Sequence, residues 1–169
     1  MKQLILGGAR SGKSRYAEQL AGLSGKRVLY LATATAGDQE MAARIQLHQQ
    51  QRPSSWQLIE EEICLAKVLF DHDATDHCIL VDCLTLWVSN LLCHENPRLL
   101  DEQKTALLEI LPKLSSDIIF VSNEVGMGII PTGELNRRFV DESGWLHQAL
   151  APLCEKVTFV AAGLPLALK

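Results

Sequence analysis

Residues 7–14, GGARSGKS, carry the strongest chemical signal in this sequence. Gly7, Gly12, Lys13 and Ser14 match the pattern G-x-x-x-x-G-K-S/T, with a short apolar run before it and an amphipathic run after it. Glycines let the backbone wind tightly, so that successive N–H groups and a helix N-terminus point at phosphate oxygens. Lys13 would supply a cation for the terminal phosphates, and the Ser14 hydroxyl would ligate Mg²⁺. The alternative is a plain glycine turn, but all four fixed positions in this context predict binding of a nucleoside triphosphate.

Asp82 ends the apolar run CILVD at residues 78–82. In proteins with a phosphate-binding loop, an Asp at the end of such a strand holds Mg²⁺, usually through water. The position would also allow Asp82 to cap a helix over residues 84–92. The loop at residues 7–14 favours the metal-binding interpretation.

His48 lies in the polar stretch DQEMAARIQLHQQQ, residues 38–51, which has the character of a helix. Arg44, His48 and Gln51 fall within about 60° of one another on such a helix. A neutral imidazole is a competent nucleophile towards phosphorus, and arginine would stabilise the charge that develops on the phosphoryl oxygens. The spacing alone favours a solvated surface histidine and leaves the nucleophile as the alternative.

The stretch SNEVGMGIIP, residues 122–131, follows another apolar run, where open α/β sheets place their ligand loops. Gly126 and Gly128 could let a ligand approach the backbone, or could only satisfy the geometry of the loop. Both interpretations stay open.

Several other polar residues are interpreted structurally. Arg137 and Arg138 could meet phosphate, although ion pairs with acidic neighbours on the same helix are the default. Trp145 and His147 are expected to contribute packing. The acidic residues 60–62 are expected at a solvated helix start, where the helix dipole favours negative charge.

Short apolar runs alternate with longer amphipathic runs along the chain. The patterns predict strands at residues 3–6, 27–33, 56–60, 78–83, 117–123 and 156–163, and helices at residues 13–23, 38–51, 62–70, 84–92, 99–114 and 134–155. Strands that are apolar nearly throughout, separated by helices, predict a mostly parallel central sheet with helices on both faces. Residues 164–169 are interpreted as a tail. We therefore expect an α/β fold in a single nucleotide-binding domain, residues 1–169.

The composition limits the classes of partner. Apolar residues make up 47% and charged residues 21% of the chain, as in globular proteins. The net charge is −4 without any block of Lys or Arg, which argues against nucleic acid as the main ligand. No apolar run reaches about 18 residues, so no membrane span is expected, and the protein is expected in the cytoplasm. The 5 cysteines form no C-x-x-C pair and are expected to be buried free thiols.

Several segments together resemble the family of bifunctional adenosylcobinamide kinases/adenosylcobinamide-phosphate guanylyltransferases. In chain order they are GGARSGKSRYAE, VLYLATA, EMAARIQLHQQQRP, ILVDCLTLWVSNLL, NEVGMGIIP and the closing GLPLALK. The phosphate-binding loop is generic, whereas NEVGMGI and RIxxHxxxRP together are specific.

The resemblance implies a RecA-like P-loop fold, a homotrimer and a role in assembly of the nucleotide loop of adenosylcobalamin. Such enzymes transfer a phosphoryl group from ATP or GTP to the aminopropanol hydroxyl of adenosylcobinamide. They then transfer GMP from GTP to adenosylcobinamide phosphate, which gives adenosylcobinamide-GDP and pyrophosphate. The second reaction passes through a GMP–histidine intermediate, and His48 occupies the position of that histidine.

The resemblance also implies roles for individual residues. His48 and Lys13 are the expected catalytic residues, and Ser14 and Asp82 are the expected ligands of Mg²⁺. The expected nucleotide contacts are Gly7, Gly8, Ala9, Arg10, Ser11, Gly12, Lys13, Ser14, Thr33, Ala34, Thr35, Gln49, Gln50, Gln51, Arg52, Glu60 and Asp82.

Two positions depart from the family pattern. Gln49 stands where many members have a basic residue, and His147 stands where the family often has Asn. Neither change removes a residue with an expected chemical role. Two other functions stay open on the residues alone: a nucleotide-dependent binding or regulatory module, and a kinase that lacks the transferase activity.

Overall fold

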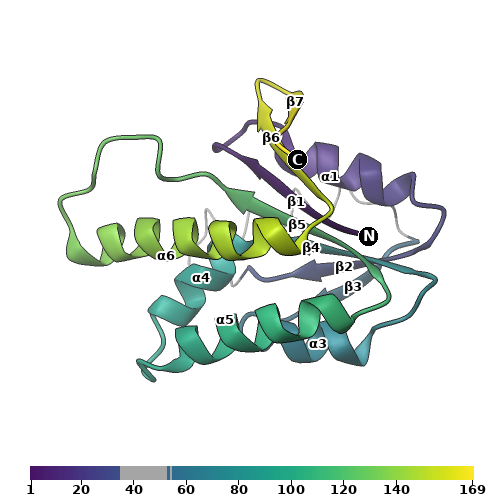
Figure 1. The fold of residues 1–169 in the computed structure, drawn as a ribbon, viewed down its shortest axis with the longest axis horizontal. Helices are drawn as coiled ribbons and strands as arrows, with labels where there is room; N and C mark the ends of the chain where they lie inside the picture. The colour runs from purple at the N-terminus through teal and green to yellow at the C-terminus, as the bar shows by residue number, and fades with distance from the viewer. Residues whose placement is uncertain (35–52, 54) are drawn as a thin grey trace.

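Seven strands form one sheet, and the strand before the phosphate-binding loop lies inside it (Figure 1). In this computed structural model, which describes residues 1–34, 53 and 55–169, the sheet order is β3-β2-β4-β5-β1-β6-β7. The strands are β1 Lys2–Gly7, β2 Arg27–Ala32, β3 Gln57–Glu60, β4 His77–Asp82, β5 Asp117–Asn123, β6 Lys156–Ala161 and β7 Leu164–Ala167. Strands β1 to β6 pair in parallel, and β7 is antiparallel to β6. The predicted mostly parallel sheet is confirmed.

Helices cover both faces of the sheet, as predicted (Figure 1). The helices are α1 Lys13–Gly22, α3 Leu65–Asp71, α4 Leu84–Leu92, α5 Leu99–Ile110 and α6 Glu134–Leu150. Two short 3₁₀ helices, Leu111–Lys113 and Ala151–Leu153, follow α5 and α6. Each carries a proline, which lacks the N–H that a continuing α-helix needs, so α5 and α6 end earlier than the apolar pattern predicted. The helix predicted over residues 38–51 lies outside the described residues.

Alternating side chains of the strands divide the apolar core into two layers. Leu4 and Phe120 belong to the layer under α3, α4, α5 and α6. Ile5, Tyr30 and Val121 belong to the layer under α1. Because both faces of the inner strands are buried, their sequences are apolar almost without interruption.

The residues predicted to be a tail form the last strand instead. The turn between β6 and β7 consists of Ala162 and Gly163, which both have positive φ angles, of 52° and 78°. Two consecutive residues in this conformation make a tight turn that matches the twist of a two-stranded hairpin. An alanine in the first position is unusual there, so residues 162–163 do not read as a hairpin turn in the sequence.

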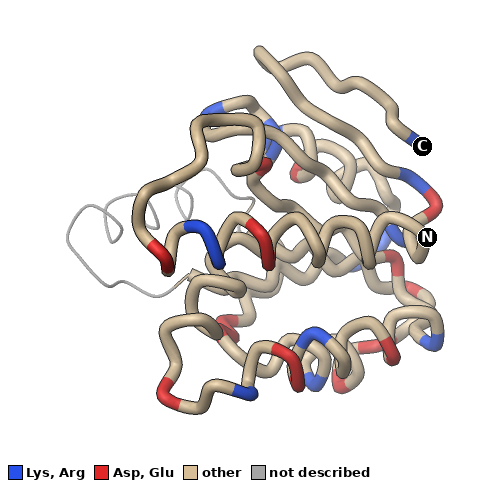
Figure 2. The backbone as a smooth tube through the Cα atoms, turned by 60° about the vertical axis from the view of Figure 1, so that its left-hand side comes forward, with Lys and Arg blue, Asp and Glu red and all other residues tan. Residues whose placement is uncertain are grey.

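The surface charges are mixed, and the cysteines are unpaired. Basic and acidic residues are interspersed over the molecule and along its lower helices (Figure 2). No helix among the described residues has the length and apolar character needed to cross a membrane. All 5 cysteines are free; Cys78, Cys83 and Cys154 are buried as predicted, whereas Cys64 is only partly buried and Cys93 is exposed. The prediction of a buried thiol is therefore wrong for Cys93.

Asp73 anchors the start of β5 to the loop that precedes β4. Its carboxylate accepts hydrogen bonds from the backbone N–H groups and the hydroxyls of Ser115 and Ser116, at 2.6–3.0 Å. Partial burial opposes ionisation, but these hydrogen bonds prevail and lower the pKa of Asp73 to about 2. The ionised carboxylate thus stabilises the folded state.

We expect Asp73→Ala to lower the free energy of unfolding by about 1–2 kcal/mol at neutral pH, allowing for the partial exposure of the carboxylate. Because the folded-state pKa is depressed, this stabilisation is present above about pH 4 and is lost as the pH falls towards 2. Urea unfolding of wild type and variant between pH 7 and pH 2 measures the difference. Asp71→Ala, which removes an exposed ion pair with Lys67, is the control and should change stability little. A constant difference across the whole range would contradict the assignment.

Candidate nucleotide-binding site

The segment between β1 and α1 has the shape of an anion-binding loop. Ser11 N–H donates to the Gly8 carbonyl at 3.2 Å and closes a turn, and Arg10 and Gly12 follow with positive φ angles of 56° and 94°. Helix α1 then begins at Lys13, with Gly12 as its N-cap. N–H groups at the start of a helix of 10 residues carry a partial positive charge. Residues 7–14 therefore form a wound loop that leads into a helix N-terminus, the geometry that binding of phosphate needs.

Close backbone contacts explain two of its glycines. A Cβ atom on Gly7 would lie 2.5 Å from both the Val160 carbonyl oxygen and the Ser11 hydroxyl. A Cβ atom on Gly12 would lie 3.1 Å from Cα of Gly163, in the turn between β6 and β7. Gly163 N–H also donates to the Ser11 carbonyl at 2.8 Å. The terminal hairpin therefore supports the loop from behind, a contact that the sequence did not indicate.

Lys13 projects from the first turn of α1 back over the loop. Its side chain is 9% exposed, and its ammonium donates to the Gly8 carbonyl at 3.3 Å. Burial lowers the pKa of Lys13, and the neighbouring Cys83 and Asp82 oppose this change. A partly desolvated ammonium attracts phosphate oxygens more strongly than one in bulk water. The role of Lys13 as a phosphate ligand stays a prediction, with which this position over the loop agrees.

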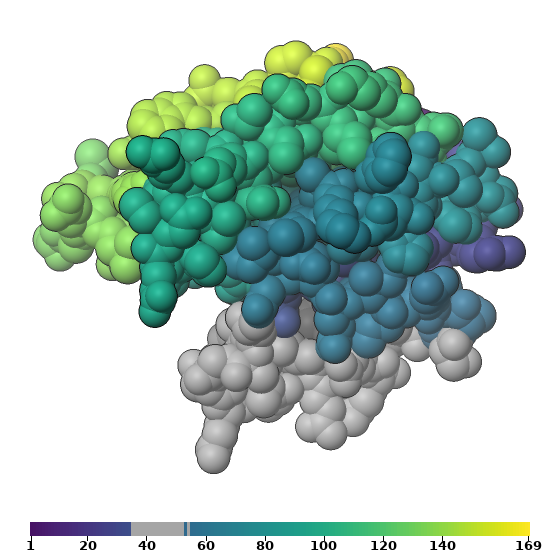
Figure 3. All heavy atoms as spheres, turned by 90° about the horizontal axis from the view of Figure 1, so that it is seen from below, coloured from purple at the N-terminus to yellow at the C-terminus, as the bar shows by residue number. Residues whose placement is uncertain are grey.

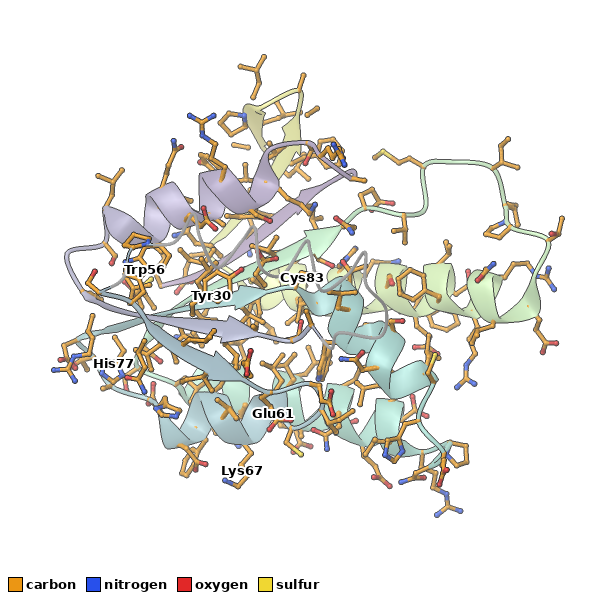
Figure 4. The ribbon with its side chains drawn as sticks, turned by 180° about the vertical axis from the view of Figure 1, so that it is seen from behind. Tyr30, Trp56, Glu61, Lys67, His77 and Cys83 are labelled. Atoms are coloured by element: carbon orange, nitrogen blue, oxygen red, sulfur yellow. The ribbon has the colours of Figure 1, made fainter. Side chains whose placement is uncertain are left out.

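Asp82 and its neighbours join the carboxyl ends of β2 and β4. The Tyr30 hydroxyl donates to Oδ2 of Asp82 at 2.9 Å. Thr33 is fully buried; its hydroxyl donates to the Cys83 carbonyl at 2.7 Å and accepts from the Cys83 N–H at 2.9 Å. Asn90 of α4 donates to the Thr33 carbonyl at 2.8 Å. Tyr30 and Cys83 lie near one another on the face that α1 covers, whereas His77, the first residue of β4, lies at the amino end of that strand (Figure 4).

The start of α4 tests the capping interpretation of Asp82, whereas the metal-binding interpretation stays a prediction. Cys83, not Asp82, is the N-cap of α4, and α4 has no side-chain cap hydrogen bond among the described residues. The capping alternative is therefore wrong. The Cys83 thiol is buried, and burial followed by the charge of Asp82 raises its pKa to about 11, so it stays protonated at neutral pH.

The oxygen atoms of Ser14 and Asp82 suit Mg²⁺ that arrives with a nucleotide. They are too few to hold a metal ion by themselves. Ser14 and Asp82 offer hydroxyl and carboxylate oxygens, the ligand type that Mg²⁺ prefers. Among the described residues no group of 3 or more His, Cys, Asp or Glu side chains is arranged to hold a metal ion. A cation here would therefore draw most of its ligands from nucleotide phosphates and water, as Mg²⁺ commonly does.

The loop after β5 projects from one end of the molecule (Figures 1 and 3). Met127, Ile129 and Ile130 are 79%, 98% and 77% exposed. Gly126 N–H donates to Oε1 of Glu124 at 2.6 Å, and a Cβ atom on Gly126 would lie only 3.0 Å from that oxygen. The crowding atom is the flexible end of a side chain, and a Cβ atom on Gly128 would meet nothing within 4 Å, so both interpretations of the two glycines stay open.

Helix α6 departs from the expectations for Arg137 and Trp145, and it adds a polar contact to the expected burial of His147. Arg137 donates to the carbonyls of Pro131 and Thr132, at 3.2 and 2.5 Å, and so holds the end of the loop rather than an acidic neighbour. Trp145 is 57% exposed, so the expected packing role is wrong for it. His147 is buried, but its ring bonds to a polar group: Nε2 lies 2.8 Å from the Ser122 hydroxyl. Burial lowers the pKa of His147, against the attraction of Glu124.

The predicted site residues fall into three groups. Residues 7–14 and Asp82 lie together at the carboxyl ends of β1 and β4, and Asp82 is close enough to act on the charge of Lys13. Thr33 and Ala34 follow β2, the strand beyond β4, at the same carboxyl end of the sheet. Glu60 ends β3 at the same edge, but β3 is four strand spacings from β1, about 19 Å. In the acidic run, Glu61 accepts the N–H groups of Ile63 and Cys64 just before α3, as expected at a helix start. His48, Thr35, Gln49, Gln50, Gln51 and Arg52 lie outside the described residues.

The fold and the loop together define a nucleoside-triphosphate-binding α/β protein of the P-loop class. A solved protein from Pyrococcus horikoshii superposes with a TM-score of 0.58 at 8% identity, covering 99% of this chain and 85% of that chain. The RadB recombinase gives 0.51 at 16% identity, with 94% and 73% covered. The flagellar accessory protein FlaH from Methanocaldococcus jannaschii gives 0.51 at 14% identity, with 99% and 77% covered. These similarities show the fold alone.

Sequence comparison identifies the family within this class. The family model described as cobinamide kinase / cobinamide phosphate guanyltransferase matches residues 3–168. The bifunctional adenosylcobalamin biosynthesis protein CobP of Pseudomonas aeruginosa is 57% identical over 169 residues, covering 100% of this chain and 98% of that protein. CobU of Salmonella typhimurium, described by the same words, is 38% identical over the full length of both. The chain belongs to the cobinamide kinase / cobinamide phosphate guanyltransferase family and is an enzyme.

The contacts of Gly7 lead to a prediction. Gly7→Ala should weaken GTP binding by about tenfold or more, because a methyl group cannot fit against the Val160 carbonyl without moving the loop. Titration calorimetry with GTP and Mg²⁺ measures this. Gly144→Ala is the matched control: it lies inside α6, where a Cβ atom meets nothing within 4 Å, and should leave GTP affinity unchanged. Equal GTP affinities in wild type and Gly7→Ala would refute the packing argument.

Proposed function

We propose that this one site carries out both reactions of its family in the biosynthesis of adenosylcobalamin. In the first, a phosphoryl group passes from ATP or GTP to the hydroxyl of adenosylcobinamide. In the second, GMP passes from GTP to adenosylcobinamide phosphate and pyrophosphate leaves. The observation that carries the proposal is the family match over residues 3–168 on a fold whose loop, Lys13 and Asp82 share one edge of the sheet.

The described residues suit transfer of the terminal phosphoryl group. The loop N–H groups and the N-terminus of α1 favour the negative charge of the phosphates. Lys13, held over the loop, neutralises charge on the phosphate that leaves with the nucleoside diphosphate. Positioning of the substrate hydroxyl in line with the breaking bond supplies the rest of the rate enhancement.

Attack at the α-phosphorus needs a second group, and His48 is the residue that we propose for it. A ring nitrogen of His48 would displace pyrophosphate from GTP and hold GMP until the phosphate of the corrinoid takes it. This two-step route lets one triphosphate site serve acceptors that bind in turn. The proposal for His48, and that for nucleotide contacts by Thr35, Gln49, Gln50, Gln51 and Arg52, rests on the sequence.

Mg²⁺ is proposed as the metal that accompanies the nucleotide. Ser14 and Asp82 would hold it through their oxygens, and Tyr30 orients the Asp82 carboxylate by its hydrogen bond to Oδ2. When bound, the ion would neutralise charge on the phosphates. The remaining proposed contacts, by Thr33, Ala34 and Glu60, would come from the ends of β2 and β3.

The surroundings of the site are also proposals. The exposed apolar loop that contains Met127, Ile129 and Ile130 is proposed to contact the corrinoid. A homotrimer is proposed from the resemblance, and exposed leucines on β7, Leu164 and Leu166, offer apolar surface for a subunit contact. The free cysteines fit a reducing compartment, and we propose the cytoplasm.

The proposed guanylyl transfer leads to a prediction for His48. Incubation with α-labelled GTP and Mg²⁺ should give a covalent, acid-labile adduct that maps to His48. His48→Ala should abolish this adduct and the transfer of GMP to adenosylcobinamide phosphate, while phosphoryl transfer to adenosylcobinamide is largely retained. His94→Ala, in an exposed loop, is the control and should behave as wild type. Full guanylyl transfer by His48→Ala would overturn the proposed route; a protein with neither activity and no adduct would instead be a regulatory module.

The proposed use of one triphosphate site by both reactions leads to a prediction for Lys13. Lys13→Ala should lower kcat/KM of both reactions by about 100-fold or more, because both use the same triphosphate site. Steady-state rates with adenosylcobinamide and with its phosphate measure the two effects separately. Lys67→Ala removes an exposed lysine outside the site and serves as the control. Loss of only one activity in Lys13→Ala would mean that the two reactions use different nucleotide sites.

A further inference from the structure

Glu124 lies directly after β5, the strand between β1 of the phosphate-binding loop and β4 of Asp82. Its backbone N–H donates to the Gly7 carbonyl at 3.0 Å, at the residue where the loop begins. The main chain of Glu124 is thus attached to the first residue of the phosphate site. The Glu124 carboxylate has no part in the nucleotide or metal contacts of the proposed function.

The side chain of Glu124 is held, yet it can be reached from solvent. Gly126 N–H donates to one carboxylate oxygen at 2.6 Å, and Nδ1 of His147 lies 4.0 Å from the other. The side chain is 22% exposed, whereas that of His147 is only 9% exposed. A carboxylate that is oriented on one side and open on the other can accept a hydrogen bond from a ligand.

A buried polar network fixes the end of β5 on which Glu124 stands. The Ser122 hydroxyl bonds to Nε2 of His147 at 2.8 Å and lies 3.3 Å from the Thr85 hydroxyl. Thr85 accepts the Asn123 N–H at 2.6 Å. Helices α4 and α6 are therefore both joined to the last residues of β5. The network gives Glu124 the fixed position that a group acting on a substrate requires.

Other side chains at this edge of the sheet suit the role less well. Asp82 accepts the Tyr30 hydroxyl and is the proposed metal ligand. Cys83 is only 9% exposed. Glu60 stands on β3, whereas Glu124 follows the strand that pairs directly with β1. Among the described carboxylates that follow these strands, Glu124 is the one beside the phosphate-binding loop.

We propose that Glu124 is the residue that accepts the proton of the substrate hydroxyl during phosphoryl transfer. This assignment rests on the proposed function. The hydroxyl oxygen of adenosylcobinamide forms a bond to the γ-phosphorus, and the bond from that phosphorus to the β-phosphate oxygen breaks. The hydroxyl proton passes to the Glu124 carboxylate, and the nucleoside diphosphate leaves with the electron pair of the broken bond. Proton acceptance by a positioned side chain typically contributes about 10²–10⁴-fold to a rate.

The same residue has no proton to accept in the guanylyl transfer. There the acceptor is a phosphate monoester, which is largely a dianion above its second pKa of about 6. Its oxygen attacks phosphorus without losing a proton. The two reactions therefore differ in their need for Glu124, and this difference provides an internal control.

The test is Glu124→Gln, whose amide oxygen can still accept the Gly126 N–H. Measured at pH 8, kcat for phosphorylation of adenosylcobinamide should fall by about 100-fold or more. Formation of the labelled GMP adduct and GMP transfer to adenosylcobinamide phosphate should stay within about twofold of wild type, which also shows that the variant is folded. Glu134→Gln, an exposed glutamate at the start of α6, is the matched control and should change neither activity.

The outcomes separate this assignment from the proposed function. Kinase activity of Glu124→Gln within a few-fold of wild type would overturn the assignment and leave the proposed function standing. An equal loss of both activities would also overturn it, because Glu124 would then support the structure of the site. If Glu124→Gln does not fold, Glu124→Asp keeps the carboxylate and must retain measurable kinase activity, while Glu124→Ala must lose it. A wild-type enzyme without either activity would instead overturn the proposed function.

Discussion

The phosphate-binding loop depends on the close approach of backbone to backbone at both of its ends, and this constraint shapes its surroundings. Gly7 lies against the Val160 carbonyl of β6, and Gly12 lies against Gly163 in the turn that follows. Backbone N–H groups of Glu124 and Gly163 donate to the carbonyls of Gly7 and Ser11. The donors that would face a phosphate are therefore held by strands on both sides of β1, not by the loop alone. A loop that is fixed before the ligand arrives loses less entropy when it binds.

Hydrogen bonds also join the carboxyl ends of β2 and β4 to each other and to α4. The Thr33 hydroxyl bonds to both backbone groups of Cys83, and Asn90 of α4 bonds to Thr33. These bonds tie the residue after Asp82 to the end of β2, and the end of β2 to α4, and the charge of Asp82 acts on the partly desolvated ammonium of Lys13. Fixed charges in a place of low water content stabilise a transition state without having to reorganise first. The hydrogen bonds at these strand ends therefore both stabilise the sheet and position the charged groups of the proposed site.

The sequence predicted the elements that follow from the periodicity of apolar residues and from local motifs. It did not predict features that depend on contacts between distant segments. Apolar runs such as CILVD indicated strands buried on both faces, and the glycine and lysine spacing of residues 7–14 indicated the phosphate site. The β6–β7 hairpin was missed because Ala162 takes a positive φ angle that alanine rarely adopts. His147 is buried as expected, but its hydrogen bond to Ser122 was not predicted. Helical spacing shows that a residue faces the core and does not show which polar group it meets there. His48 stands apart: its spacing favoured a surface residue, and only the resemblance supports its proposed role.

The two reactions make different demands on one bound triphosphate, and the strand order distributes the proposed groups accordingly. Glu124 follows β5, which pairs with β1, whereas the chain segment that contains His48 follows β2. Strands β4 and β5 lie between β2 and β1, so the two segments leave the sheet at separate points along its carboxyl edge. A proton acceptor for the terminal transfer and a nucleophile for the internal phosphorus can then belong to different segments. In the proposed function Lys13 and the loop would serve both reactions, so the shared part of the site would lie in β1 and α1. The groups specific to one reaction would lie in the connections that follow β2 and β5.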